Sequence, residues 1–515
     1  MRIGVDVGGT NTDAVLMEGR RVVASTKRST TADVTGGIVE ALETVLGDAG
    51  VDAGAIEAVM IGTTHFTNAV VERRIAPAAC VRLGLPATEA LPPMVDWPDD
   101  LRDVSGCRWY LAHGGNEFDG RELSPLDEAE LCAIAADLRA HDIRSIAVSA
   151  VFSPVTPDAE ERAAAVLQQE LPEATMTLSH EIGRIGLLER ENAAIVNACL
   201  RDLARTTVNG FRMALEHLGL DSPLYLTQND GTLMTAGFAE RFPVLTFSSG
   251  PTNSMRGAAF LSGLRDAIVI DVGGTTTDVG VLTRGFPREA ALAVSIGGVR
   301  TNFRMPDVLS VGLGGGSIVT GDPWRVGPRS VGYRLGSEAL IFGGATVTAT
   351  DIAVAGGLIE LGDPARVAHL QADAPAVLDV IAAMVRDAVD AARVSAEPLP
   401  VVVVGGGSPL AVAALRNVDV VTPEHSAVAN AVGAAIAQVS GEVDHIVSLD
   451  GTTREAALSA SVAAAIARAV AAGADAETVQ VVDIEDVPLA YLPGNATRVR
   501  VKVAGDLPGG GGNGR

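Results

Sequence analysis

The sequence predicts an α/β fold with two similar halves and a small C-terminal α/β appendage. Strand-like apolar runs alternate with helical patterns along most of the 515 residues, as is typical of α/β proteins. One stretch occurs twice, as Val5-Asp6-Val-Gly-Gly-Thr-Asn-Thr-Asp13 and as Ile270-Asp271-Val-Gly-Gly-Thr-Thr-Thr-Asp278, and the composition changes near Gly441. We therefore expect a first half at 1–180, a second half at 181–440 and an appendage at 441–515.

The repeated stretch has the composition of a loop that binds phosphate and magnesium. In each copy an apolar strand ends in an aspartate, and two glycines, threonines and a second aspartate follow. The glycines allow a tight turn with an exposed backbone, and the threonines offer hydroxyl and N–H groups to an anion. The first aspartate is a hard oxygen ligand of the kind that Mg²⁺ prefers. One copy could be an ordinary turn, but two copies predict two halves that face each other across a phosphate site.

Composition excludes several classes of protein. The net charge of −24 disfavours nucleic acid as a partner, because this surface would repel phosphate backbones. No apolar run approaches ~18 residues, so we expect no membrane span. The first strand begins directly after Met1, which leaves no room for a signal peptide and indicates the cytoplasm. The four cysteines show no C-x-x-C spacing, which disfavours a structural zinc or a redox pair.

Missing motifs narrow the chemistry further. The chain has two lysines, Lys27 and Lys502, and no G-x-x-x-x-G-K-[ST] motif, so it is not a P-loop enzyme. Phosphate donors must then be backbone N–H groups, hydroxyl groups and arginines. The G-x-S-x-G and H-E-x-x-H motifs of serine hydrolases and zincins are also absent.

The first part of the chain has the pattern of strands joined by helices. We expect strands at 3–7, 21–28 (the second of a meander), 56–61, 143–152, 176–178 and 224–227, and helices at 33–47, 126–141, 156–171 and 187–218. Residues 8–13 form the first loop, and residues 84–125 are rich in Pro and Gly without a clear period. Gly62-Thr63-Thr64 lies between a strand and a short helix ending near Arg73, so it either binds an anion or caps that helix.

The second part continues the alternation. A helix begins near Met255, strands follow at 267–271, 308–311 and 401–404, and helices follow at 410–415 and 430–439. The 405–409 loop could lie flat against a purine or ribose, because it has few side chains. The 312–317 loop either grips phosphate or forms an interdomain hinge. In the appendage, a helix at 453–472 lies between strands near Ile446 and Val481, a further strand covers 498–503, and 509–515 is a disordered tail.

The ordered series of motifs resembles a known family. The two D-V-G-G-T-x-T-D loops and the V-V-V-V-G-G-G-S strand-turn resemble the phosphate-1, phosphate-2 and adenosine motifs of the actin-like ATPase superfamily. Residues 1–440 resemble more closely the hydantoinase A/5-oxoprolinase family, through Gly62-Thr-Thr-His-Phe-Thr-Asn-Ala69, Ser179-His-Glu181, Glu189-Arg190, Gln228-Asn-Asp-Gly231, Ser249-Gly-Pro251 and Gly312-Leu-Gly-Gly-Gly-Ser317. The resemblance implies duplicated actin-like (ribonuclease-H-like) halves around a nucleotide cleft.

The resemblance also implies an activity, namely ATP-dependent opening of a cyclic amide such as a hydantoin, a lactam or 5-oxoproline. ATP would phosphorylate the carbonyl oxygen, water would attack, and phosphate would leave. Relatives often work with a separately encoded second subunit, so we expect such a partner and an oligomer. Two alternatives remain open: a small-molecule kinase of the same fold, and a non-catalytic ATP-sensing module that activates a partner enzyme.

Site residues follow from the same resemblance. Asp6 and Asp271 would be catalytic and would hold Mg²⁺, while Asp13 and Asp278 brace their loops. Phosphates would be bound by Gly8, Gly9, Thr10, Thr12, Gly273, Gly274, Thr275 and Thr276, with Gly314 and Gly315, and the adenosine would lie on Gly405, Gly406 and Gly407. A second divalent metal, Mn²⁺ or Zn²⁺, has the candidate ligands His65, His113, His180, Glu181 and Asp230, of which the last three are favoured. Each histidine could instead be structural.

The sequence departs from many relatives at two places. Ile61 stands where they carry a histidine before Gly-Thr-Thr, and His65 follows the turn instead. The Pro-Gly-Pro-Ala-Cys-Tyr stretch that follows their GGGS loop is replaced by Leu335-Gly-Ser-Glu-Ala-Leu-Ile-Phe342. The ring substrate therefore cannot be copied from the family.

Overall fold

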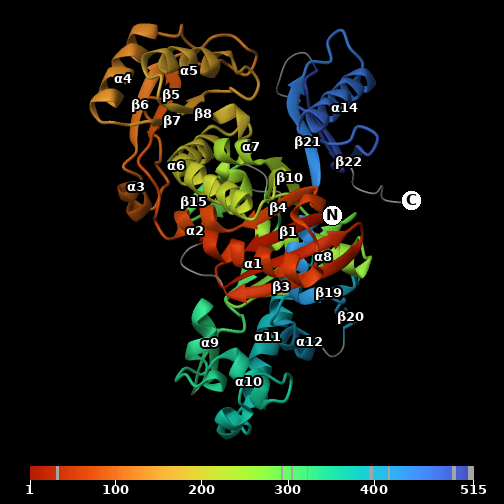
Figure 1. The fold of residues 1–515 in the computed structure, drawn as a ribbon. Coiled ribbons are helices and arrows are strands. Elements are labelled where there is room, and N and C mark those ends of the chain that lie inside the picture. Colours follow the sequence, from red (N-terminus) through yellow and green to blue (C-terminus); the bar gives the residue numbers. More distant parts are fainter. Residues whose placement is uncertain are drawn as a thin grey trace.

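The structure is a computed structural model of the chain and describes residues 1–29, 34–290, 294–302, 305–321, 323–393, 398–415, 418–489 and 495–508. In Figure 1 the N-terminal strands (red) lie in the middle, a unit drawn in orange at upper left, helices drawn in cyan below, and the C-terminal unit (blue) at upper right. The predicted α/β class is confirmed, since strands and helices alternate along the described residues. The predicted helix start at Asp33 and the predicted tail at 509–515 lie outside the described residues.

The first half is built on the sheet that carries the first copy of the repeated stretch. Its strands are β1 (Arg2–Val7), β2 (Asn11–Glu18), β3 (Arg21–Ser29), β4 (Ala58–Thr63) and β9 (Leu224–Thr227). They lie in the order β3-β2-β1-β4-β9, with β1 to β3 antiparallel and β1, β4 and β9 parallel. The helices of this part are α1 (Val34–Ala49), α2 (His65–Val71) and α6 (Leu187–His217).

The second half repeats this strand order. Its sheet has the order β13-β12-β11-β19-β20, with β16 also beside β12; the strands are β11 (Ala267–Val272), β12 (Thr277–Thr283), β13 (Phe286–Pro287), β16 (Val308–Val311), β19 (Val401–Val404) and β20 (Val420–Val421). Asp6 pairs with Asp13 across the first hairpin, and Asp271 pairs with Asp278 across the second in the same register. The duplication predicted from the repeated stretch is therefore present in the fold.

Smaller elements complete the second half. Its helices are α9 (Leu335–Glu338), α10 (Ala349–Ala355), α11 (Ala374–Ala392) and α12 (Ser408–Ala414). Two hairpins pair β14 (Val294–Ile296) with β15 (Val299–Thr301), and β17 (Ser317–Thr320) with β18 (Arg325–Ser330). The short 3₁₀ turns along the chain are η1 (Ala53–Ala55), η2 (Ser179–Glu181), η3 (Pro243–Thr246), η4 (Gly332–Arg334), η5 (Leu340–Phe342), η6 (Pro364–Leu370) and η7 (Ser426–Val428).

A separate parallel sheet is inserted between β4 and β9. Its order is β6-β5-β7-β8, from β5 (Ala79–Leu85), β6 (Arg108–His113), β7 (Ser145–Ala150) and β8 (Thr175–Leu178). The helices α4 (Glu128–Ala140) and α5 (Asp158–Glu170) pack on it, whereas Leu101 of α3 (Asp99–Ser105) belongs to the main core. Asp127 caps α4, because its carboxylate accepts hydrogen bonds from the N–H groups of Ala129 and Glu130. This unit is the orange part of Figure 1.

Two helices exchange sides between the halves. Helix α8 (Ser249–Ser262) follows β9 and β10 of the first sheet along the chain, within the predicted segment 181–440, and packs on β11 and β19 of the second sheet. Helix α13 (Ala429–Ala435) comes from the end of the second half and packs on β1 and β2 of the first. The two helices also pack on each other, so they connect both sheets at the centre of the molecule.

The C-terminal strands extend the first sheet. Strand β10 (Thr232–Thr235) pairs with β21 (Gln438–Val447), which pairs in turn with β23 (Thr497–Gly505) and through it with β22 (Gln480–Pro488). The result is one nine-stranded sheet in the order β22-β23-β21-β10-β9-β4-β1-β2-β3. Helix α14 (Arg454–Ala471) packs on β21 and β23 of this sheet. This sheet contains strands from all three predicted segments, and β21 crosses the boundary predicted at 440/441.

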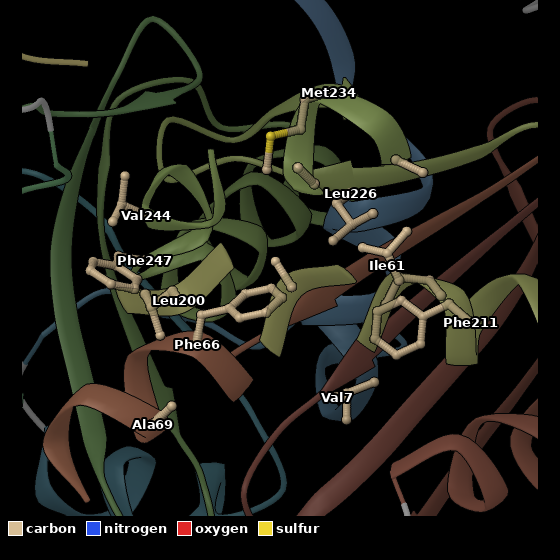
Figure 2. Packing of buried hydrophobic residues seen from close by; sticks show 14 of the residues in the cluster. Val7, Ile61, Phe66, Ala69, Leu200, Phe211, Leu226, Met234, Val244 and Phe247 are labelled. Carbon is tan, nitrogen blue, oxygen red and sulfur yellow. The ribbon is translucent and has the colours of Figure 1, made fainter. Parts of the chain in front are cut away.

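The main core lies between the first sheet and the helices that cover it. Figure 2 shows Val7, Ile61 and Leu226 from the strands beside Phe66 of α2 and Phe211 of α6. All five side chains are buried. At about 25 cal/mol per Å² of apolar surface, burying aromatic rings of this size makes the cluster a major source of stability. The core therefore holds β1, and with it the first repeated loop, on a rigid base.

Two sequence predictions about elements are wrong, and one stretch without a predicted element contains two. Thr12 and Asp13 lie in β2 rather than in a loop. A tight turn at Gly19 (φ 58°) then joins β2 to β3, so the strand that begins at Arg21 is the third of the meander and not the second. Residues 84–125 contain α3 and β6, whose short lengths hid their periods. The helix predicted at 430–439 ends at Ala435, because Gln438 already pairs with β10.

Among the described residues, no single helix has both the length and the apolar content for a membrane span. The bent pair of η6 and α11, which meet at 87°, reaches the criterion only when the two are taken together, and only by length and composition.

Candidate functional site: the paired loops between the halves

The two copies of the repeated stretch form the same turn. The N–H of Gly8 donates to the carbonyl of Asn11 at 3.0 Å, and the N–H of Gly273 donates to the carbonyl of Thr276 at 2.9 Å. Each turn follows the central strand of its sheet, β1 or β11. The local sequence thus builds two equivalent loops, one from each half.

The loops meet tip to tip. The hydroxyl oxygens of Thr10 and Thr275 lie 3.3 Å apart, within hydrogen-bond distance. A Cβ on Gly274 would lie 2.8 Å from Cγ2 of Thr10, so glycine is needed for this approach. Among the described residues, the N–H groups of Gly9, Thr10, Gly274 and Thr275 have no hydrogen-bond partner. They are therefore available to an anion held between the two loops.

The carboxylate of Asp6 is buried and held by two amides. Asn253 Nδ2 on α8 donates to Oδ1 at 3.2 Å, and Asn430 Nδ2 on α13 donates to Oδ2 at 3.0 Å. Burial, with a smaller contribution from the charge of Asp13, raises the pKa of Asp6 to about 6, although the two amides lower it. A cation at this position would stabilise the ionised form.

The second half has a matching pair of carboxylates. Ser254 Oγ donates to Asp271 Oδ2 at 2.5 Å, and burial raises the pKa of Asp271. Burial also raises the pKa of Asp278 to about 7, helped by the charge of Asp271, although the hydroxyl of Ser310 donates to it. Both carboxylates therefore pay a desolvation cost that a bound cation would offset.

The chain's first lysine lies at this site. Lys27 Nζ is 2.6 Å from Asp13 Oδ2, and Asn430 Nδ2 donates to the same oxygen at 2.7 Å. Sequence reasoning missed Lys27, Asn253, Ser254 and Asn430. The only local signal for them was the Ser249-Gly-Pro251 motif just before Asn253 and Ser254; Asn430 and Lys27 carried none.

Equivalent glycines lie beside the two strand-end aspartates. A Cβ on Gly62, at the end of β4, would be 2.5 Å from Asp6 Oδ1. A Cβ on Gly405, after β19, would be 2.3 Å from Asp271 Oδ1, and its φ is 88°. Each half therefore needs glycine where its fourth strand passes the carboxylate. Gly406, by contrast, has open space at its Cβ position, on the exposed side of the 405–409 loop.

The 312–317 loop lies directly behind the second repeated loop. The N–H of Gly315 donates to the carbonyl of Gly273 at 3.0 Å, and the N–H of Gly316 donates to that of Gly274 at 2.7 Å. The N–H of Gly314 donates to Ser317 Oγ at 2.8 Å. The amides of Gly314 and Gly315 are thus used inside the protein, and these residues brace the second repeated loop from behind.

The Gly-Thr-Thr turn at 62–64 leads directly into α2, whose N-cap residue Thr64 makes no side-chain capping bond. Thr63 Oγ1 accepts a hydrogen bond from the N–H of His65 at 3.1 Å, at the start of α2. This satisfies one of the N–H groups that a helix start leaves unpaired. The turn thus contributes one side-chain contact to the start of α2, and anion binding at this turn stays a prediction.

The three favoured ligands of a second metal do not come together. His180 Nδ1 lies 2.7 Å from Glu160 Oε2, Glu181 is paired with Arg241 at 2.6 Å, and Asp230 with Lys502 at 2.7 Å. His113 contacts Glu130 at 3.2 Å instead, and burial lowers the pKa of His65 at the start of α2. Within the described ranges, no group of three or more His, Cys, Asp or Glu side chains could hold a metal ion. The predicted cluster of His180, Glu181 and Asp230 is therefore wrong, because each side chain has its own partner.

The donor set between the loops does fit Mg²⁺ bound together with phosphate. Mg²⁺ in nucleotide sites uses one or two carboxylates, with phosphate oxygens and waters completing the shell. Asp6 and Asp271 supply two carboxylates from opposite halves, and the charge of Asp271 adds a small contribution to the raised pKa of Asp6. Oδ1 of Asp13 is buried and has no hydrogen-bond partner among the described residues. The residues present thus match a metal that shares its ligands with a phosphate group.

The fold and this site define a class of protein. Two halves with the same strand order, each ending its central strand in an aspartate and a Gly-Gly-Thr turn, form a duplicated α/β protein with its paired loops between the halves. Two family models then match: the hydantoinase/oxoprolinase N-terminal region at residues 2–171 and hydantoinase/oxoprolinase at residues 190–368. The chain belongs to the hydantoinase/oxoprolinase family.

Curated relatives include subunits of two enzymes. The chain is 28% identical over 395 residues to caprolactamase subunit alpha of Pseudomonas jessenii, covering 70% of this chain and 55% of that protein. It is 27% identical over 402 residues to the acetophenone carboxylase gamma subunit of Aromatoleum aromaticum, covering 69% and 53%. The chain thus matches about half the length of these curated relatives.

Solved structures share the fold over nearly the whole chain. The ATP-dependent caprolactamase from Pseudomonas jessenii superposes with a TM-score of 0.78 at 19% identity, covering 99% of this chain and 88% of that one. A nucleotide-free acetone carboxylase structure superposes with a TM-score of 0.73 at 18% identity, with the same two coverages. At these identities the likeness concerns the fold.

Proposed function

We propose that the chain binds ATP between its two halves and uses it to activate a carbonyl compound. The observation that carries this proposal is the meeting of the two Gly-Gly-Thr loops, with Thr10 and Thr275 Oγ1 atoms 3.3 Å apart. Two loops that bring unpaired N–H groups and hydroxyls to one point suit a chain of phosphates. The family supports the same assignment.

The chain's own residues would divide the work. Gly9, Thr10, Gly274 and Thr275 would bind phosphate oxygens through backbone N–H groups and hydroxyls. Asp6 and Asp271 would hold Mg²⁺, which supplies positive charge against the charge that develops on the phosphates. The amides of Asn253 and Asn430 orient Asp6, while Ser254 orients Asp271. Gly405, Gly406 and Gly407 would form the surface for the adenosine.

The reaction we assign is the ATP-dependent opening of a cyclic amide, such as a hydantoin, a lactam or 5-oxoproline. The carbonyl oxygen attacks the γ-phosphorus, an O–P bond forms, and the bond to ADP breaks. Water adds to the activated carbon, the ring C–N bond breaks, and the nitrogen takes up a proton. A second water releases phosphate and leaves a carboxylate. The sum is one ATP and two waters consumed, with ADP, phosphate and the ring-opened acid formed, which is an amino acid from a lactam or 5-oxoproline and an N-carbamoyl amino acid from a hydantoin.

A second candidate shares the first step. One curated relative is a subunit of acetophenone carboxylase, whose name implies a ketone rather than a cyclic amide as substrate. Phosphorylation of a ketone-derived oxygen would use the same phosphate loops. The relatives are named as subunits, so we further propose that this chain works with a separately encoded partner in an oligomer.

Phosphate release measures this proposal directly. The purified chain, with and without the product of a neighbouring gene, is incubated with ATP, Mg²⁺ and a panel of hydantoins, lactams and imides. A second arm uses ketones with bicarbonate. Release that depends on a cyclic amide supports the hydrolase, and release that depends on a ketone supports the carboxylase. A stable phosphorylated product would indicate a kinase instead, and compaction on ATP binding without turnover an ATP sensor.

Asp271→Asn gives the sharpest test of the paired loops. The variant keeps the shape and one acceptor for Ser254 but removes a buried charge, so the fold should persist. We expect phosphate release to fall about 100-fold, equivalent to roughly 2.7 kcal/mol of transition-state stabilisation. Asp379→Asn, at an exposed position of α11, is the matched control and should change release less than twofold. Normal release by Asp271→Asn would show that the loops do not act as a pair.

A further inference from the structure

The side chain of Lys27 lies on the same face of the first sheet as the aspartates of the first repeated stretch. Lys27 of β3 is directly opposite Asp13 of β2, which is directly opposite Asp6 of β1. Opposed residues of antiparallel strands point to the same side of a sheet, so the three side chains share one face. Asn430 of α13 covers this face, since it donates to both aspartates. Lys27 therefore belongs to the surroundings of the first loop.

The second half carries a serine at the equivalent position. Ser310 of β16 is directly opposite Asp278 of β12, as Lys27 of β3 is directly opposite Asp13 of β2. The hydroxyl of Ser310 donates to Asp278 Oδ1. A neutral hydroxyl is therefore sufficient to hold the second aspartate of the repeated stretch. Since the hairpin does not need a cation, the charge of Lys27 indicates a further role in the first half.

The ammonium group of Lys27 uses one of its donors inside the protein. Its Nζ lies 2.6 Å from Asp13 Oδ2, and within the described ranges it makes no other hydrogen bond. An ammonium group has three N–H bonds, so two are available to a ligand. The Lys27 side chain is 33% exposed, whereas that of Asp13 is 2% exposed. A buried aspartate thus anchors a cation that remains accessible.

The charge of Lys27 also acts on the second half. Burial raises the pKa of Asp271, whereas the hydroxyl of Ser254 and the charge of Lys27 lower it. The ammonium group is therefore close enough to the second loop for its charge to be felt there. The carboxylates of Asp6, Asp13 and Asp271 would all repel an anionic ligand, and Lys27 supplies an opposing charge from the protein itself.

We propose that Lys27 binds the terminal phosphate oxygens of the nucleotide, with Asp13 as the residue that positions its ammonium group. The inference rests on the proposed ATP-dependent function, in which the adenosine lies on the 405–407 loop of the second half. The far end of the phosphate chain then reaches the first half, where Lys27 is. Lysine binds phosphate as a compact point charge with several donors. It adds to the donors expected from the sequence, which were backbone N–H groups, hydroxyls and arginines.

Nucleotides with different numbers of phosphates test this assignment. The full chain is titrated calorimetrically, with Mg²⁺, against the non-hydrolysable ATP analogue AMPPNP and against AMP. We expect Lys27→Met to weaken AMPPNP binding about tenfold or more and AMP binding less than twofold, and Lys27→Arg to restore part of the loss. Arg28→Met is the matched control, because Arg28 is the next residue of β3 and donates to Thr44 of α1 at 3.2 Å. This control should keep both affinities within twofold of the wild type.

The two nucleotides also separate the possible outcomes. If Lys27→Met weakened AMPPNP and AMP equally, or weakened neither, the proposal would be overturned while ATP binding itself stood. A wild-type chain that binds neither nucleotide would refute the ATP-dependent function, and this inference with it.

Acylation of amines provides a second measurement on the wild-type chain. The sequence has two lysines, and the side chain of Lys502 is 5% exposed, so among the lysines the reagent reports mainly on Lys27. Mass spectrometry of peptides gives the rate. With Mg²⁺, AMPPNP should slow acylation of Lys27 about fivefold or more, and AMP should not. The α-amino group of Met1, at the other end of β1 from the loop, is the internal control. If Lys27→Met does not fold, this measurement decides, and an unchanged rate at Lys27 with AMPPNP bound would overturn the proposal.

Discussion

The side chain of Asn430, on α13, forms hydrogen bonds to two aspartates of the first sheet. Its Nδ2 donates to Asp6 Oδ2 at 3.0 Å and to Asp13 Oδ2 at 2.7 Å, although it lies 424 residues from Asp6. The amide is neutral, so it bridges two buried carboxylates without adding charge. The buried carboxylates of Asp6 and Asp13 are therefore stabilised by a hydrogen-bond donor from a distant part of the chain.

Replacing this amide by a carboxylate should destabilise the protein in a pH-dependent way. Asn430→Asp removes both donors and adds a third charge, which we expect to lower the free energy of unfolding by about 2–4 kcal/mol at pH 7.5. The pKa values of Asp6 and Asp13 are raised in the folded state, so folded protein binds more protons and the loss shrinks as the pH falls. Urea unfolding at pH 5.5 and 7.5 measures this. Asn209→Asp, exposed on α6, is the control, and an equal loss at both pH values would contradict the prediction.

The Glu160–His180 pair gives a second pH dependence at this scale. Burial by itself would raise the pKa of Glu160, but the hydrogen bond with His180 and the charges of Arg190 and His180 lower it. Burial by itself would lower the pKa of His180, but the hydrogen bond and charge of Glu160, with the charges of Glu181 and Glu161, raise it. The glutamate contributes stability above its unfolded value of 4.5 and loses it as the pH falls through the folded value. The histidine contributes stability below its unfolded value of 6.5 and loses it as the pH rises through the folded value.

The pair should therefore stabilise the fold most between about pH 4.5 and 6.5. His180→Gln should lower the free energy of unfolding by about 1 kcal/mol or more at pH 6 and by less at pH 9. Thermal melts of wild type and variant from pH 5 to 9 measure the difference. His141→Gln, at the exposed end of α4, serves as the control, and a difference that does not change with pH would show that the pair carries no net charge interaction.

At the scale of elements, the crossing of α8 and α13 carries the connection between halves. A Cβ on Gly257 would lie 1.8 Å from the carbonyl oxygen of Ala429, and a Cβ on Gly433 would lie 1.8 Å from that of Asn253. The helices thus approach backbone to backbone at the crossing. This closeness places Asn253 and Ser254 of α8, and Asn430 of α13, at the two aspartates.

Alanine at the crossing should be strongly destabilising although alanine favours helices. We expect Gly257→Ala and Gly433→Ala each to lower the free energy of unfolding by about 3 kcal/mol or more, since backbone atoms cannot give way. Gly237→Ala is the matched control, because it lies in α7 (Ala236–Arg241) with nothing within 4 Å of its Cβ position. That variant should gain up to ~1 kcal/mol. Urea unfolding measures all three, and similar values for crossing and control would refute the close approach.

At the scale of the whole molecule, buried cations on β23 connect three regions. Lys502 Nζ lies 2.7 Å from Asp230 Oδ2, in the turn between β9 and β10, and 3.5 Å from Glu289 Oε1 of the second half. Arg500 Nη2 lies 2.8 Å from Glu289 Oε1, and its Nε lies 2.9 Å from Glu442 Oε1 of β21. The C-terminal strands are therefore tied both to the first sheet and to the second half.

Removing one cation should weaken the whole fold. Lys502→Met leaves Asp230 and Glu289 partly buried with one fewer positive partner, and we expect a loss of about 2–4 kcal/mol. Arg205→Met removes an exposed pair with Asp202 and should cost less than about 0.5 kcal/mol. Differential scanning calorimetry also reports whether the C-terminal part unfolds with the rest. If the C-terminal part of the wild-type protein unfolded in a separate transition at lower temperature, these ion pairs would not connect it to the rest of the fold.

The sequence predicted the parts of the site that lie within short segments. The Asp-Val-Gly-Gly-Thr loops are defined by neighbouring residues, because an apolar strand and a glycine turn are local features. Their repetition also predicted the duplicated fold. Short elements in 84–125 and the end of α13 were missed, because a segment of a few residues has too few positions to show a period. The favoured metal cluster failed because spacing does not reveal that Asp230 pairs with Lys502 and Glu181 with Arg241.

By itself the sequence determined the α/β class, the two equivalent loops and the family, since each depends on residues close together in the chain. Tertiary structure decided which donors surround the aspartates, because Asn253 and Asn430 come to Asp6 from helices that exchange between the halves. It also decided that the C-terminal strands continue the first sheet, through the pairing of Leu233 with Val439. Such long-range pairings depend on the packing of the whole core, and no local pattern in the chain encodes them.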